Sequence, residues 1–130
     1  MTVTTETPLG QVRALGSAHA GGRHWGQERA ISVATLVLFV WLGVSLFRLP
    51  ALDQATVAQW LHTPLAAVPM LLLIVVTFQH LRMGLIVVVE DYVHEEGTRF
   101  GWVMLINFAS VFAAALALFC VLKIAFSPAA

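Results

Sequence analysis

Three long apolar stretches separated by short polar ones dominate the chain from about residue 29 onward. They run over about residues 29–48, 65–92 and 100–126. About 20 apolar residues in a helix are enough to cross the hydrocarbon core of a bilayer, so each stretch can form a span. The pattern therefore predicts an all-α membrane protein whose residues 29–126 form three transmembrane helices.

The polar segments between and before these stretches have their own predicted roles. Residues 1–28 are rich in Thr, Gly and His and are expected to lie at the membrane surface. Residues 53–62 predict a short interfacial helix with Asp53 at its N-cap. The apolar side of that helix would consist of Val57, Trp60 and Leu61. Residues 93–99 predict a polar hairpin, with Gly97 as a natural helix stop.

Composition supports a small membrane protein and excludes some functions. Of the 130 residues, 59% are hydrophobic and 11% are charged, and the formal net charge is zero. Without a basic stripe, nothing favours a nucleic-acid partner. Cys120 is the single cysteine, so the chain cannot form an internal disulfide or a thiolate metal cluster by itself.

The distribution of basic residues predicts the orientation of the spans. Three spans place the two termini on opposite sides of the membrane. Four basic residues flank the N-terminal side and two flank the other side: Arg13, Arg23, Arg29 and Arg99 against Arg48 and Lys123. Because cytoplasmic segments carry the excess of Lys and Arg, this count favours a cytoplasmic N-terminus.

His80 is an ionisable residue near the middle of the second predicted span. Such a residue is costly in a bilayer unless it has a partner, which makes it a candidate functional residue. One interpretation is a histidine that hydrogen-bonds a neighbouring helix. The other is a metal ligand, with haem iron the obvious metal because one imidazole per chain suffices when a second subunit supplies the other. From position alone both interpretations stay open.

Helical geometry relates His80 to residues further along the same span. Eleven residues separate it from Asp91, which amounts to about 1100° of rotation and about 16 Å of rise. Both residues would therefore lie on one helix face, together with Gly84 and Val87. Gly84 would leave a groove that admits a flat ligand or another backbone.

Asp91 and Tyr92, the only tyrosine, stand where the second span leaves the membrane. They are either a solvated helix end with an aromatic anchor or part of a site for a polar headgroup. In the second case the tyrosine hydroxyl donates to a carbonyl oxygen, while the aspartate holds a cationic residue or relays protons.

Two arginines have comparable alternatives. Arg29 is either a positive anchor at the interface or a clamp for a carboxylate or propionate. Arg82 lies about 200° round the helix from His80 and so faces another neighbour. It would pair with a carboxylate of a partner subunit or with a bound anion.

The run from His80 to Tyr92, with Gly84 and Asp91 at their spacings, resembles the second helix of the hydrophobic membrane anchor subunits of succinate dehydrogenase, respiratory complex II. The resemblance covers nearly the whole chain. Segments near the N-terminus are similar to bacterial, especially alphaproteobacterial, members: Leu15-Gly16-Ser17-Ala18, His24-Trp25 and Glu28-Arg29-Ala30.

This resemblance implies specific roles. His80 would be an axial ligand of haem b, with the other ligand from the sister anchor subunit, which is of the cytochrome b556 type. Tyr92 would hydrogen-bond a carbonyl of ubiquinone, and Asp91 would orient an arginine of that sister subunit near the quinone. Arg29 would lie near the haem propionates, and His24 fits the same region less well. The three spans would form part of a heterodimeric anchor bundle.

The resemblance also implies the rest of the complex. The chain has neither a dinucleotide fingerprint for a flavin nor a cysteine set for iron–sulfur clusters. A flavoprotein subunit and an iron–sulfur subunit would supply them and would be docked on the membrane by this chain. As a non-flavin subunit, the chain would serve respiratory electron transfer and the tricarboxylic acid cycle in the bacterial inner membrane.

Two alternatives remain open from the sequence. One is the anchor of a fumarate reductase, which runs the same chemistry in reverse. The other is a small transport or structural membrane protein in which His80 and Arg82 line a polar pathway. That alternative predicts proton or solute flux without haem and without an obligate flavoprotein partner.

Overall fold

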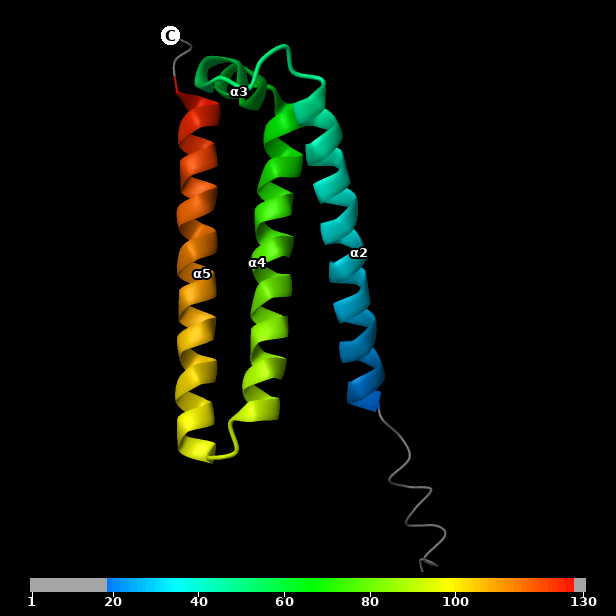
Figure 1. Ribbon diagram of the computed structural model, residues 1–130, viewed down its shortest axis with the longest axis vertical. Coiled ribbons are helices and arrows are strands. Elements are labelled where there is room, and N and C mark those ends of the chain that lie inside the picture. Colours follow the sequence, from blue (N-terminus) through cyan, green and yellow to red (C-terminus); the bar gives the residue numbers. More distant parts are fainter. Residues whose placement is uncertain (1–18, 128–130) are drawn as a thin grey trace, which may run out of the picture.

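The computed structural model describes residues 19–127, and these form four helices. They are α2 (His19–Phe47), α3 (Gln54–Leu61), α4 (Pro64–Tyr92) and α5 (Glu96–Phe126) (Figure 1). Three helical segments are long and apolar enough to cross a membrane: Trp25–Phe47, Pro64–Tyr92 and Glu96–Phe126. The predicted all-α class with three spans is confirmed.

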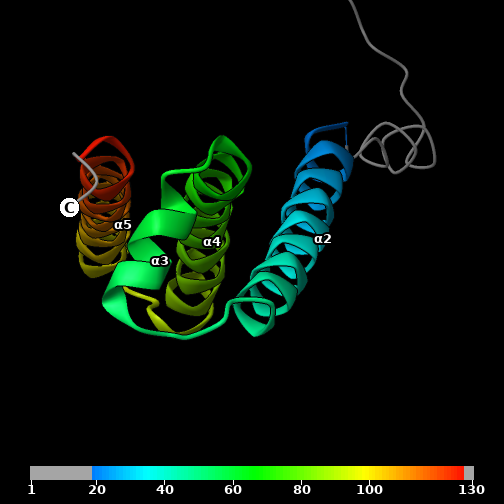
Figure 2. The ribbon, with the colours of Figure 1, turned by 90° about the horizontal axis from the view of Figure 1, so that it is seen from above.

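The three long helices stand side by side in one layer rather than closing into a bundle. Viewed from above, α4 lies between α2 and α5 (Figure 2). It packs against both of these helices, whereas α2 and α5 do not pack against each other. The described start of α2 and the α4–α5 turn lie at one end of the layer, and α3 and the end of α5 lie at the other (Figure 1). Both faces of the layer are therefore open to lipid or to another membrane subunit.

Very little apolar surface is buried within the described part of the chain. The buried apolar residues are Leu61, Ala66 and Leu73, whereas most large apolar side chains on the long helices are exposed. In water such exposure would be costly, but in a membrane lipid tails or partner helices cover it. The pattern of burial thus agrees with a membrane subunit.

Helix α3 is attached to the ends of two long helices. The Trp60 ring stacks on Trp41 of α2, with ring centroids 5.8 Å apart and planes inclined by 26°. His62, just after α3, has its Nδ1 3.0 Å from the carbonyl oxygen of Ala125 near the end of α5. Carbonyls in a last helical turn lack intrahelical partners, so this contact gives one of them a hydrogen-bonding partner.

The predicted start of α3 at Asp53 is confirmed. Asp53 occupies the N-cap with an extended backbone, and its carbonyl accepts from the N–H of Val57 at 3.1 Å. Its carboxylate accepts a hydrogen bond from the Thr56 hydroxyl at 2.5 Å. This hydrogen bond stabilises the charged form and holds the pKa of Asp53 below its usual range.

Two helix boundaries differ from the predictions. Helix α2 begins at His19, ten residues before the predicted start of the first span at Arg29. Helix α5 begins at Glu96, so Gly97 lies in its first turn and the prediction that Gly97 stops a helix is wrong. Negative charge is favourable near a helix N-terminus, which accounts for a start beside Glu95 and Glu96.

Some predictions concern the part of the chain before these boundaries. Residues 1–18, including Arg13, lie outside the described residues, as do the side chains of Arg23 and His24. The surface location of the segment 1–28 stays a prediction.

Candidate functional site

His80 opens onto a hollow between α2 and α4. Its side chain is exposed, and the hollow has a volume of about 250 Å³. The hollow is lined by two residues of α2, Glu28 and Ser32, and by four of α4, His80, Met83, Gly84 and Val87. The predicted common face is thus confirmed for His80, Gly84 and Val87. Asp91 does not line this hollow.

Gly84 leaves the open surface that the sequence predicts. A β-carbon placed on Gly84 would meet no other atom within 4 Å, apart from its own helix backbone. Within this chain, therefore, nothing occupies the space one turn after His80. A flat ligand or a partner helix could approach the backbone of α4 closely at this point.

Ser32 on α2 contacts the ring of His80, which sequence reasoning missed. The Ser32 Oγ lies 3.5 Å from the Nδ1 of His80. The same hydroxyl donates a hydrogen bond to the carbonyl oxygen of Glu28 at 2.8 Å. His80 thus has a polar neighbour on the adjacent helix, while the rest of its ring is exposed toward the hollow.

Arg29 lies beside a second hollow that adjoins the first. Its guanidinium carbon is 4.2 Å from the centre of the Trp25 ring, a cation–π contact. The hollow has a volume of about 430 Å³. It is lined by Trp25, Glu28, Arg29, Ser32 and Val33. Because Glu28 and Ser32 line both hollows, the surface beside Arg29 is continuous with the surface beside His80.

Asp91 and Tyr92 form the exposed end of α4. Tyr92 is 80% exposed and is the last residue of the helix. Neither side chain makes a hydrogen bond or an ion pair within residues 19–127. Both are thus available to a ligand or a partner subunit at the end of the layer that carries the α4–α5 turn.

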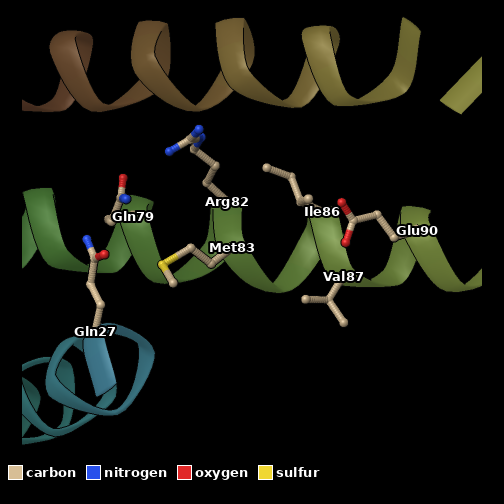
Figure 3. Close-up of a pocket in the computed structure, with 7 residues that line it drawn as sticks. All are labelled: Gln27, Gln79, Arg82, Met83, Ile86, Val87 and Glu90. Atoms are coloured by element: carbon tan, nitrogen blue, oxygen red, sulfur yellow. The ribbon is translucent and has the colours of Figure 1, made fainter. Parts of the chain in front are cut away.

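Within the described residues, Arg82 has a hydrogen-bond partner that the sequence did not predict. Its Nε donates a hydrogen bond to the Oδ1 of Asn107 on α5. Only the Nε–H is engaged here, so the predicted pairing of Arg82 with a carboxylate of a partner subunit or with a bound anion stays a prediction. Figure 3 shows Arg82 pointing from α4 toward α5, away from Gln27 of α2.

Arg82 lines a hollow of about 290 Å³ that adjoins the hollow beside His80. Its walls are Gln27, Gln79, Arg82, Met83, Ile86, Val87 and Glu90 (Figure 3). Met83 and Val87 line both hollows and so lie between them.

Within the described residues, no group of three or more His, Cys, Asp or Glu side chains is arranged to hold a metal ion. A metal bound entirely by this part of the chain would need such a group. Haem iron is different, because its porphyrin supplies four nitrogen ligands and each of two chains need supply only one imidazole.

Residues 3–122 match a model of the family described as "Succinate dehydrogenase/Fumarate reductase transmembrane subunit". The chain belongs to this family. It is 25% identical over 93 residues to the succinate dehydrogenase hydrophobic membrane anchor subunit of Rickettsia bellii (strain RML369-C), covering 72% of this chain and 74% of that protein. The subunit of the same name from Rickettsia conorii (strain ATCC VR-613 / Malish 7) is 30% identical over 79 residues, 60% and 63% of the two chains. No solved structure matches the chain significantly.

Family membership confirms the resemblance found in the sequence. The family includes anchors of both succinate dehydrogenase and fumarate reductase, but both relatives are succinate dehydrogenase anchors. The membrane-anchor function in succinate dehydrogenase is therefore favoured over the alternatives. With its three apolar helices, the chain is a multi-pass membrane protein, and its family places it in an oxidoreductase complex with partner subunits.

Proposed function

We propose that this subunit helps to bind haem b through His80 and ubiquinone through Tyr92 and Asp91. The same subunit anchors the flavoprotein and iron–sulfur subunits of a bacterial succinate dehydrogenase to the inner membrane. The observation that carries the proposal is the exposed imidazole of His80 beside an open hollow within an apolar span. Such a residue is expensive in lipid unless a partner satisfies it.

The size of the hollow supports a site shared with a second subunit. Its volume of about 250 Å³ lies below the roughly 300–1,000 Å³ of typical small-molecule pockets. The missing wall would come from the cytochrome b556-type sister anchor, which would also supply the second imidazole for the iron. When bound, the haem would supply a one-electron redox centre inside the membrane.

Arg29 is the residue of this chain proposed to hold a haem propionate. Its hollow adjoins that of His80 through Glu28 and Ser32. A guanidinium can donate two parallel hydrogen bonds to one carboxylate, and its charge offsets that of the propionate. The Trp25 ring beneath the guanidinium would keep the side chain oriented during this interaction.

Tyr92 and Asp91 are proposed as the contribution of this chain to ubiquinone binding. The exposed phenol can donate a hydrogen bond to a quinone carbonyl, which orients the headgroup and stabilises negative charge on that oxygen. The Asp91 carboxylate would orient a cationic residue of the sister subunit. Twelve residues separate Tyr92 from His80, about 18 Å along the helix, so the two ligands would occupy separate sites.

Docking of the soluble subunits follows from this arrangement. Electrons must reach the quinone at the end of the layer where Tyr92 lies, so the iron–sulfur subunit would dock there, with the flavoprotein subunit beyond it. The excess of basic residues on the same side supports a cytoplasmic location for that end and for the N-terminus.

A reduced-minus-oxidised optical spectrum of the purified complex tests the haem assignment. His80→Ala is expected to remove or alter the b-type signal, because the iron loses one axial ligand. His94→Ala is the matched control, since His94 is an exposed histidine in the α4–α5 turn. A b-type signal that is identical in wild type and His80→Ala would contradict the proposal.

A further inference from the structure

We infer that Ser32 is a positioning residue for His80. Its hydroxyl oxygen accepts a hydrogen bond from Nδ1–H of the ring, which leaves Nε2 unprotonated and free to bind iron. The inference rests on the proposed ligand role of His80 and adds a residue from another helix to that site.

The direction of the hydrogen bond follows from counting protons. A serine hydroxyl has one proton and two acceptor lone pairs. The Ser32 proton is directed to the carbonyl oxygen of Glu28, 2.8 Å away. Toward the Nδ1 of His80, 3.5 Å away, Ser32 can then act only as the acceptor. The contact is therefore a hydrogen bond only in the tautomer that carries its proton on Nδ1.

That tautomer is the one a metal ligand needs. In a neutral imidazole one nitrogen carries the proton and the other keeps a lone pair. Ligating histidines almost always donate their second N–H to an acceptor, which fixes the ring orientation and raises the basicity of the ligand. Ser32 makes the only hydrogen bond to the His80 ring within residues 19–127.

The length of the contact limits its strength. At 3.5 Å it lies at the long end for a hydrogen bond, so Ser32 is expected to orient and tune the ring rather than to hold the haem by itself. Removing the hydroxyl should consequently shift the properties of the haem without abolishing its binding. This expectation separates Ser32 from His80, whose removal costs the iron a ligand.

The chain offers a matched control one turn further along α2. The Thr35 hydroxyl donates to the carbonyl oxygen of Ile31 at 2.8 Å, the same bond to the residue four positions earlier that Ser32 makes. Thr35 makes no hydrogen bond to His80. Thr35→Val thus removes the same kind of bond from the same helix without touching the proposed ligand.

The experiment uses the purified complex with Ser32→Ala, Ser32→Thr, Thr35→Val and His80→Ala. The haem midpoint potential and the ferric electron paramagnetic resonance spectrum are measured for each. Ser32→Ala is expected to keep the haem but shift its midpoint potential to more positive values. Without the acceptor the imidazole is less basic and stabilises ferric iron less.

Ser32→Ala should also shift the ferric low-spin signal of the electron paramagnetic resonance spectrum, because the His80 ring is freer to turn. Ser32→Thr retains a hydroxyl and should resemble wild type, as should Thr35→Val.

Other outcomes overturn the inference in recognisable ways. If Ser32→Ala matches wild type in both measurements while His80→Ala loses its signal, the Ser32 role is refuted and the ligand role of His80 stands. If Thr35→Val shifts the potential as far as Ser32→Ala, the effect is general loosening of α2 and the inference fails. If wild type has no b-type haem, or His80→Ala keeps an unaltered one, the proposed function fails and takes this inference with it.

Discussion

The Nε of Arg82 on α4 donates a hydrogen bond to the Oδ1 of Asn107 on α5, within the apolar part of the hairpin that these helices form. An arginine in a span is costly, and the amide dipole of Asn107 offsets part of this cost without neutralising the charge. No carboxylate forms a salt bridge with Arg82 within the described residues. The pair therefore joins α4 to α5 and leaves a positive charge in the layer.

Asn107→Leu is expected to destabilise the complex more than the loss of one contact alone, because it leaves Arg82 without a hydrogen-bond acceptor. Interhelical hydrogen bonds in membranes contribute about 0.6 kcal/mol on average and up to about 1.7 kcal/mol. We expect the stability of the complex to fall by an amount near the upper value, as measured by thermal unfolding of the purified complex. Adding Arg82→Met to Asn107→Leu should recover part of it. Fully additive effects of the two changes would show that the pair is not coupled.

Substitutions at Gly84 distinguish between two roles for the helix face that carries His80, packing and ligand binding. Alanine favours a helix by about 1 kcal/mol over glycine, and a β-carbon at Gly84 meets nothing within this chain. Gly84→Ala should therefore leave the fold intact, whereas Gly84→Leu should reduce haem content by filling the hollow beside His80. Gly43 on α2, where an added β-carbon also meets nothing within 4 Å, is the control, and Gly43→Leu should keep the haem. Equal haem content in the two leucine variants would contradict a ligand at this face.

Tyr92→Phe removes the phenolic hydroxyl and keeps the ring. A lost hydrogen bond of about 1.4 kcal/mol corresponds to a tenfold change in affinity, so we expect roughly a tenfold rise in the KM for ubiquinone. Succinate oxidation with a water-soluble artificial acceptor should not change, and the haem spectrum should stay as in wild type. Unchanged quinone kinetics would remove Tyr92 from the proposed quinone site.

The stack of Trp60 on Trp41 predicts how α3 is held. Trp60→Leu keeps apolar bulk at the interface but loses the ring contact, which is worth about 0.5–1.5 kcal/mol beyond area burial. The thermal midpoint of the complex should fall by a few degrees. Trp60→Phe should lose less because it retains a ring. Equal losses in the two variants would show that the stacking contributes nothing measurable.

Much of the fold could be predicted from the hydrophobic pattern alone. Spans are visible because a bilayer demands about 20 apolar residues. The start of α3 was predictable at Asp53 because short polar side chains favour the N-cap. The shared face of His80 and Gly84 follows from helical periodicity, which depends only on residues of one helix.

Contacts between helices were harder to predict, because they depend on which helices are neighbours and how each is rotated. Equal depth was nevertheless a readable signal. Arg82 lies ten residues before the end of α4 at Tyr92, and Asn107 lies eleven residues after the start of α5 at Glu96. Depth alone does not say which faces meet, so the sequence could nominate this pair but could not establish it.

The contact between Ser32 and His80 was hard to predict for the same reason. Ser32 lies fifteen residues before the end of α2 at Phe47, and His80 lies sixteen residues after the start of α4 at Pro64. A serine in a span commonly bonds the carbonyl four residues earlier, so its sequence position gave no reason to expect a histidine beside it. The incorrect helix stop at Gly97 arose differently, since glycine marks a helix end only where the chain turns there.

Near-infrared magnetic circular dichroism of the ferric complex tests the central claim most directly, because its charge-transfer band reports which side chains ligate low-spin haem iron. The wild-type complex should show two histidine ligands, and His80→Met should shift the band to that of a histidine–methionine pair. Retention of the two-histidine band in His80→Met would mean that another residue binds the iron, and the assignment of His80 would be wrong.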